Sequence, residues 1–270
     1  MNRKIIFKIC IIIFLIIAIL FLSIFLSLKQ KKTLETNSDI SESNKKIGWG
    51  IKRNDKHEQP DVGKENRKIL EKYGGICLGN SESKNVYLTF DEGYEAGYTE
   101  QILEVLKNND VKATFFITAH YLNTQEDLVR RMINEGHIVG NHTVNHKSMP
   151  DLTEEEMKKE IMELHQAIYQ KFNYDMKYIR PPKGEFSERT LNATNNLGYK
   201  TVMWSFAYED WNEDKQPDEQ KSLQKILNNL HNGEIILLHG NSKTNTNILD
   251  NMIKEVKNMG YEFKSLDEFQ

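Results

Sequence analysis

The sequence of 270 residues is poor in cysteine, has no long basic tract and shows no internal repeat. Its two cysteines, Cys10 and Cys77, fall in different parts of the chain, so we do not expect a disulfide between them. A small domain held together by disulfides is therefore not expected, and the chain has to rely on its own hydrophobic core. With a formal net charge of −3, the composition gives no support to nucleic-acid binding.

The amino terminus carries an uncharged apolar run, Ile9 to Leu28, that follows the basic residues Arg3, Lys4 and Lys8. The run is about long enough to cross a bilayer as a helix, and no signal-peptide cleavage site or lipoprotein cysteine follows it. A buried core helix is the alternative, but no amphipathic face is visible. We therefore expect residues 1–30 to form a single-pass anchor in the cell membrane, with the body outside the cytoplasm. Lysines on both sides of the run weaken the charge argument for this orientation.

The rest of the chain divides by composition. Residues 31–48 are polar and predict a flexible linker, and residues 49–84 predict an ordered amino-terminal extension. From residue 85 to 270, short apolar segments alternate with amphipathic ones, which predicts parallel strands alternating with helices. The expected strands cover residues 85–90, 113–117, 137–141, 177–180, 200–204, 234–238 and 261–265, and the expected helices cover 98–109, 125–135, 153–171, 187–197, 221–230 and 247–258. Six or seven such units favour an α/β fold closed into a (β/α) barrel over a small open sheet.

Ionisable residues follow most of these strands. In a (β/α) barrel, the residues beyond the carboxyl ends of the strands share one rim, and that rim carries the active site. We therefore expect the following side chains to converge: Asp91 and Glu92, His142 and His146, Arg180, Asp210, and His239.

The spacing His142-x-x-x-His146 places two imidazoles on one side of a helical turn, where they can share a cation. Histidines at this spacing are often surface residues, but a carboxylate on the same rim favours a catalytic metal with an open position for water. Asp91 and Glu92 could divide the work, one as a metal ligand and the other as general base.

The remaining rim residues each have two interpretations. Arg180 either pairs with a surface acid or, in the stiff segment "RPPKG", is fixed beside the acids. His239 is either a core histidine or a general acid oriented by Asp210. Trp211 either packs in the core or contacts a sugar ring. The other histidines, at positions 57, 120, 137, 165 and 231, are expected to be structural or solvated.

Five motifs in order, "TFDEG", "HTVNH", "RPPKG", "EDW" and "LLH", resemble those of the polysaccharide deacetylases with a NodB homology domain, carbohydrate esterase family 4. The resemblance covers residues 85–270 and implies a distorted (β/α) barrel. It implies the following roles: Asp91 as catalytic base, Arg180 as its partner, His239 as general acid with Asp210, and His142 and His146 as ligands of a divalent cation, with zinc expected. We further expect Tyr94, Pro182 and Trp211 to bind substrate.

One position departs from the family pattern, because Glu92 stands where the family has a metal-binding aspartate. Its extra methylene shifts the carboxylate by a distance that is large for a metal bond. Glu92 therefore either coordinates through another rotamer or leaves the metal to the two histidines and water.

Longer stretches, including "YLTFDEGYEAGYT" and "GYEFKSLDEF", resemble the PdaA-type muramic-acid deacetylases of endospore-forming bacteria. This resemblance implies removal of acetyl from N-acetylmuramic acid in peptide-free peptidoglycan strands, followed by closure of the muramic δ-lactam of spore cortex. The expected partners are glycan strands and, through the anchor, the membrane; we expect no nucleic-acid partner and a monomer. The alternatives are a deacetylase of N-acetylglucosamine or chitooligosaccharides and a non-catalytic, membrane-tethered wall-binding protein.

Overall fold

A computed structural model describes residues 42–54 and 56–269. The predicted anchor, residues 1–30, and most of the predicted linker lie outside the described residues. In the part of the chain that is described, no helix is both long enough and apolar enough to cross a membrane. Residues Ser43–Gln270 form one compact unit.

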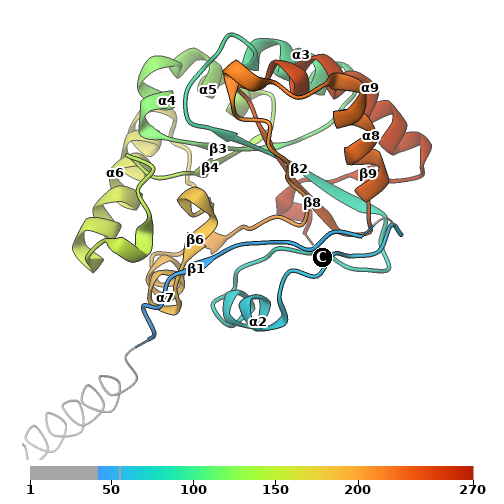
Figure 1. Cartoon of the computed structure of the whole chain (residues 1–270). Helices are drawn as coiled ribbons and strands as arrows, with labels where there is room; N and C mark the ends of the chain where they lie inside the picture. Colours follow the sequence, from blue (N-terminus) through green and yellow to red (C-terminus); the bar gives the residue numbers. More distant parts are fainter. Residues whose placement is uncertain (1–41, 55, 270) are drawn as a thin grey trace, which may run out of the picture. The chain divides into compact units, whose positions relative to one another are not determined.

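A curved parallel sheet forms the centre of this unit, with helices packed around its outside (Figure 1). The strand order is β7-β5-β4-β3-β2-β8, and β9 pairs with the start of β2. The strands are β2 Asn85–Glu92, β3 Thr114–Ile117, β4 Ile138–Asn141, β5 Tyr178–Ile179, β7 Lys200–Thr201, β8 Glu234–His239 and β9 Glu262–Phe263. Beyond β7 the chain reaches β8, where Phe206 bridges Ile236 in parallel. The two ends of the sheet therefore meet at one isolated bridge, which gives a distorted form of the expected barrel.

The helices follow the strands in the predicted alternation. They are α3 Thr99–Asn108, α4 Ala119–Thr124, α5 Glu126–Asn134, α6 Glu154–Phe172, α7 Glu188–Asn196, α8 Glu219–Asn229 and α9 Lys243–Asn258. α6 begins with a capping box in which Thr153 and Glu156 satisfy each other's backbone N–H groups. The short α4, which the sequence pattern did not indicate, begins where the Thr118 side chain accepts a hydrogen bond from the Tyr121 backbone N–H. Apolar side chains of these helices and of the sheet share one core.

The amino-terminal extension, residues 49–84, includes the helix α2 Lys64–Lys72 and lies below the sheet in Figure 1. Just before it, the strand β1 Ile47–Gly48 pairs antiparallel with β6 Glu185–Phe186. A separate apolar cluster joins extension and barrel through Trp49, Val62, Leu70, Tyr73, Cys77, Leu78, Phe186, Leu191 and Met203. Residues 43–48, expected as the end of a flexible linker, are thus ordered against the body, because β1 uses the open edge of β6.

Candidate active site

A cavity of about 900 Å³ opens at the carboxyl ends of the strands, a size that suits a small substrate. Its lining brings together Asp91, His142, His146 and His239, which come from three separate parts of the sequence. Parallel strands cause this convergence, because all their carboxyl ends meet at the same rim. Arg180 and Asp210 lie directly behind this lining, each bonded to one of its members.

Asp91 is held by Arg180 from beneath the cavity. The guanidinium is fully buried and donates to Asp91 Oδ1 at 2.7 Å, to Thr89 Oγ1 at 2.8 Å and to the Val202 carbonyl at 3.2 Å. Burial by itself would raise the pKa of Asp91, but the charges of Arg180, His142 and His239 outweigh it and hold that pKa below its usual range. Asp91 is therefore ionised at neutral pH, and Arg180 is not a surface residue paired with a stray acid.

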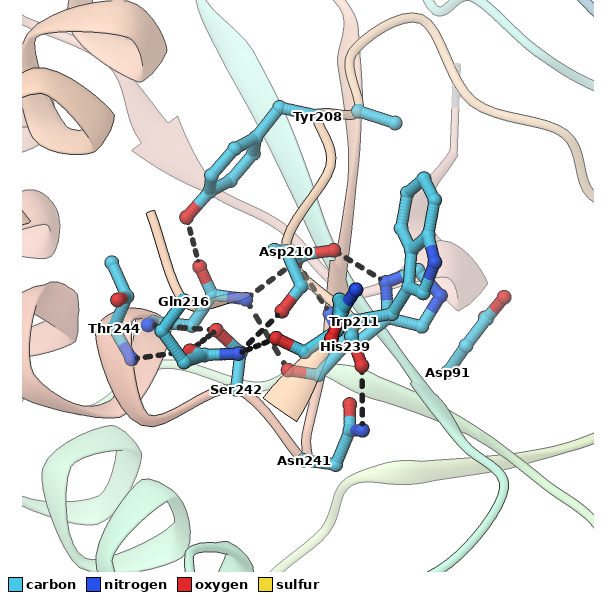
Figure 2. Close-up of polar contacts among 12 residues, drawn as sticks. Asp91, Tyr208, Asp210, Trp211, Gln216, His239, Asn241, Ser242 and Thr244 are labelled. Carbon is cyan, nitrogen blue, oxygen red and sulfur yellow. Dashed lines mark hydrogen bonds and ion pairs between the residues drawn. The ribbon is translucent and has the colours of Figure 1, made fainter. Parts of the chain in front are cut away.

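His239 is oriented by Asp210 in a dense polar network (Figure 2). Asp210 Oδ1 lies 2.7 Å from His239 Nδ1, and Oδ2 accepts hydrogen bonds from the backbone N–H of His239 at 3.0 Å and from Asn245 Nδ2 at 2.6 Å. Tyr208 in turn donates to the Asn245 side chain. Burial would lower the pKa of His239, but the adjacent Asp210 carboxylate outweighs it and raises that pKa above its ordinary value. Because Nδ1 is engaged by Asp210, Nε2 is the ring atom left for the cavity.

The sheet register places Asp91 and His239 side by side. β2 and β8 are parallel neighbours, and Asp91 is the register partner of His239. Figure 2 shows the Asp91 side chain facing the His239 ring from the adjacent strand. Two residues that are 148 positions apart in sequence therefore meet through one strand pairing.

The histidine pair lies on an irregular loop between β4 and α6, and the expected helical turn is absent from this described segment. The rings of His142 and His146 come within 4.8 Å between centroids because Thr143 and His146 adopt left-handed backbone conformations. Buried Glu160 on α6 anchors the loop by accepting hydrogen bonds from the backbone and the side chain of Asn145, both at 2.7 Å. Tertiary contacts, rather than helical periodicity, thus set this geometry.

Glu92 does not join the histidine pair, which corrects the prediction that it helps to hold the metal. β2 continues through Glu92, two residues beyond the predicted strand, and side chains alternate along a strand. Asp91 therefore faces the cavity, whereas Glu92 is fully buried on the other face against Gly240. Burial, together with Glu95 and Asp91, raises the pKa of Glu92 well above its usual range.

The site fits a divalent cation only in part. His142 Nδ1 lies 2.8 Å from the Arg180 carbonyl oxygen, which leaves Nε2 free for a metal. Burial lowers the pKa of both histidines, that of His146 to about 4, so both are in the neutral form that binds metals. In the described part of the chain, however, no three histidine, cysteine or carboxylate side chains are grouped for one ion. The pair supplies two ligands of the expected set, and Glu92 does not complete it.

Comparison with known proteins agrees with this arrangement. A family model for polysaccharide deacetylases matches residues 79–202. The chain is 42% identical over 226 residues to PdaA of Bacillus subtilis, a peptidoglycan-N-acetylmuramic acid deacetylase, covering 83% of this chain and 86% of that relative. The solved structure of the same protein, a family 4 carbohydrate esterase, has a TM-score of 0.82 at 41% identity and covers 84% of this chain and 97% of that one. The chain belongs to the polysaccharide deacetylases of carbohydrate esterase family 4.

Other members of this deacetylase family differ in substrate and in activity. A peptidoglycan-N-acetylglucosamine deacetylase of Bacillus cereus is 32% identical over 201 residues, covering 73% of this chain and 72% of the relative. A family 4 pseudoenzyme of Bacillus anthracis has a TM-score of 0.67 at 28% identity, covering 72% of this chain and 68% of that one. Family membership alone therefore does not establish activity, which depends on the side chains of the site.

Two of the three predicted substrate residues line the deacetylase cavity. Tyr94 and Trp211 are about half exposed there, at 44% and 51%, and the Trp211 ring lies 5.5 Å from that of His239. Pro182 is buried and is absent from the lining, because the loop turns so that the next two residues, Lys183 and Gly184, face the cavity instead.

The motifs also missed residues that matter to this deacetylase site. His120 is exposed, in line with the expectation that it is structural or solvated, but it also lines the cavity. Asn241 donates to the Tyr94 hydroxyl at 2.7 Å and to the Trp211 carbonyl at 3.1 Å, and so ties the two aromatic residues together. Its place two residues after the strand-end His239 was the available signal; nothing in the local sequence marks His120.

Proposed function

We propose that the chain hydrolyses the N-acetyl group of N-acetylmuramic acid in peptide-free peptidoglycan strands, which leads to the muramic δ-lactam of spore cortex. The hydrolytic activity is supported by two ion pairs that lie next to each other at the ends of β2 and β8. Asp91 is bonded to Arg180, and His239 to Asp210, on adjacent strands in register. The lowered pKa of Asp91 keeps the base deprotonated and the raised pKa of His239 favours the protonated acid, and two groups whose pKa values are pushed apart in this way suit general acid–base hydrolysis.

Asp91 acts as the general base. Arg180 holds Oδ1, so Oδ2, which lies 3.5 Å from His142 Nε2, is the oxygen that takes the proton from the attacking water. The water oxygen adds to the acetyl carbon as its proton passes to the carboxylate. Because Arg180 is fully buried and its hydrogen bonds are made before substrate arrives, the base needs no reorganisation.

His239 acts as the general acid. Its Nε2 donates a proton to the amide nitrogen as the C–N bond breaks, so that acetate and the free sugar amine leave. An amine is a poor leaving group unless it is protonated, and the raised pKa of His239 keeps that proton available near neutral pH. Asp210 stabilises the positively charged ring before the transfer.

The cofactor we propose is a divalent cation, zinc, on His142 and His146, without Glu92. When bound, such an ion supplies positive charge for the acetyl oxygen as that oxygen becomes anionic. We propose further that residues 1–30 anchor a monomer in the cell membrane with the cavity on the wall side; the uncharged run Ile9 to Leu28 supports this placement.

The two candidate substrates are N-acetylmuramic acid and N-acetylglucosamine. N-acetylmuramic acid is favoured because this chain is 42% identical to PdaA and 32% identical to the N-acetylglucosamine deacetylase of Bacillus cereus. The test incubates the chain with its first 42 residues removed, in zinc buffer, with peptide-free glycan strands and separately with chitooligosaccharides. Acetate and muramic lactam are then measured by mass spectrometry, with and without a chelator.

The proposal predicts acetate and lactam from glycan strands, both abolished by the chelator and by Asp91→Asn. Acetate from chitooligosaccharides alone would contradict the muramic substrate and favour the glucosamine activity. Binding to glycan strands with no acetate at any metal concentration would favour the wall-binding alternative and overturn the enzymatic proposal.

A further inference from the structure

We propose that Lys183 recognises a carboxylate on the substrate sugar and so selects peptide-free N-acetylmuramic acid over N-acetylglucosamine. This inference rests on the proposed function and adds the residue that decides the substrate.

Among the described residues that line the cavity, Lys183 is the only lysine or arginine. Its side chain is exposed, and no hydrogen bond or ion pair engages it within residues 42–54 and 56–269. The nearby acids are already paired, Asp91 with Arg180 and Asp151 with Lys46 at 2.5 Å. Lys183 lines the same cavity as His142 and His146.

The backbone that carries Lys183 is fixed. Lys183 and Gly184 both have left-handed conformations, with φ of 60° and 66°. A Cβ at Gly184 would lie 2.7 Å from the Trp204 ring, so the chain runs directly against that ring. The Gly184 carbonyl accepts a hydrogen bond from the Trp49 backbone at 2.8 Å, and Trp49 Nε1 donates to the Trp204 carbonyl at 2.9 Å. The extension thus clamps the turn that presents Lys183.

This conformation also argues that the side chain is used. A residue with a Cβ is disfavoured in the left-handed region, and glycine would be more stable there. Within the described residues Lys183 makes no hydrogen bond or ion pair that would offset this cost; its charge does act on Asp151, but that exposed acid is already paired with Lys46. A role toward a ligand explains why an exposed lysine occupies a position where backbone energetics favour glycine.

The substrate chemistry supplies the matching group. N-acetylmuramic acid carries a lactyl ether that ends in a carboxyl group, and N-acetylglucosamine has a hydroxyl at the same place. The stem peptide joins this carboxyl through an amide, so the negative charge is present only in peptide-free sugars. A lysine ammonium forms a charge-assisted hydrogen bond with a carboxylate and a weaker one with an amide or an alcohol. Lys183 would therefore favour both muramic acid and its peptide-free form.

The test compares peptide-free glycan strands with strands whose lactyl carboxyl has been reduced to an alcohol. Acetate release by the zinc-loaded protein is measured for the wild type and for Lys183→Gln, Lys183→Gly and Lys183→Arg. The matched control is Lys215→Gln, which removes the same charge from an exposed lysine near Trp211 that does not line the cavity. Thermal unfolding is recorded for all variants, and Lys183→Gly is expected to be at least as stable as the wild type.

We expect the wild type to prefer carboxylate strands by about 10-fold in kcat/KM, with a preference that falls as salt is raised. Lys183→Gln and Lys183→Gly should lose that preference, because their rate falls more on carboxylate strands than on reduced strands. Lys183→Arg and Lys215→Gln should keep the preference. Equal wild-type rates on the two strands would overturn the role of Lys183 and leave the deacetylase proposal intact. An equal loss of rate on both strands in Lys183→Gly would also overturn it. Absence of acetate from both strands with the wild type would instead refute the underlying function.

Discussion

At the scale of single residues, adjacent acids on one strand have opposite environments. Asp91 faces the cavity, where Arg180 and two histidines lower its pKa. Glu92 faces the protein interior, where burial raises its pKa and both carboxylate oxygens lack a hydrogen-bond partner among the described residues. One strand position therefore separates the proposed catalytic base from a neutral buried acid.

Replacing Glu92 with glutamine, its neutral analogue, tests whether Glu92 is a metal ligand. Glu92→Gln should leave zinc content unchanged, because the side chain does not face His142 or His146. A buried acid with a raised pKa destabilises the fold increasingly as pH rises above its unfolded-state pKa, since only the unfolded chain ionises freely. The variant should therefore gain stability relative to the wild type between pH 5 and pH 7 in thermal unfolding. His142→Ala is the control that should lose zinc; a comparable zinc loss in Glu92→Gln would show that Glu92 is a ligand.

The pH dependence of turnover tests the His239–Asp210 pair. Asp210→Asn keeps the shape of the side chain but removes the charge that raises the pKa of His239. The acid then loses its proton at lower pH, so the alkaline limb of kcat should move down by about one pH unit or more. Exposed Asp214→Asn, four residues along, should leave the limb in place. If the alkaline limb of kcat stays in place in Asp210→Asn, His239 is excluded as the titrating acid.

At the scale of elements, the loop between β4 and α6 depends on one buried carboxylate. Glu160 accepts hydrogen bonds from the backbone and side chain of Asn145, next to His146. Hydrogen bonds to a charged group contribute about 1.5–3 kcal/mol each, and here they hold a loop that contains two left-handed residues. The spacing of the two histidines is therefore maintained from α6.

Loosening this loop should weaken the metal site from a distance. Glu160→Ala should lower zinc affinity by about 10-fold, because ordering the loop then costs binding free energy. Competition with a chromogenic chelator measures it, alongside circular dichroism to check the fold. The control is Glu163→Ala on the same helix. The Glu163 carboxylate is exposed and pairs with Lys159 of that helix at 3.7 Å. Equal zinc affinity in the two variants would show that the loop holds its shape without Glu160.

At the scale of the whole described unit, the extension and the barrel share a core. Trp49, Leu70 and Tyr73 from the extension pack against Phe186, Leu191 and Met203 of the barrel. Without the extension, the barrel side chains that these residues cover would be exposed to water. Burial of one large apolar side chain stabilises the fold by about 1.5–3 kcal/mol, so the loss would be substantial. The extension therefore forms part of the folding unit.

Truncation tests this dependence. A chain that begins at Ser43 should unfold cooperatively, whereas one that begins at Asn85 should melt at markedly lower temperature or aggregate, because the apolar cluster is opened. Differential scanning calorimetry of the two chains measures the difference. A third chain that begins at Trp49 removes β1 together with the polar contacts of Asn44 and Lys46, and should show an intermediate loss. Equal melting temperatures for the first and second chains would contradict the shared core.

The sequence pattern predicted much of this molecule, because it depends on periodicity and on local signals. Alternating apolar strands and amphipathic helices gave the βα order, and Thr153-x-x-Glu156 marked the start of α6. The same pattern missed α2, β1 and β6. Segments of two residues, or of mixed polarity, have no periodicity to detect, and β1 and β6 exist only because they pair with each other.

The sequence by itself determined which chemical groups are available and that they follow strands of a parallel sheet, since residue type and periodicity are local properties. Only the tertiary structure decided which of those groups meet. The side-chain alternation of β2 turned Glu92 away from the histidines, the β2–β8 register set Asp91 beside His239, and the clamp of Trp49 on Gly184 directed Lys183 to the cavity. Each of these depends on contacts between segments that are distant in sequence, and no local pattern encodes them.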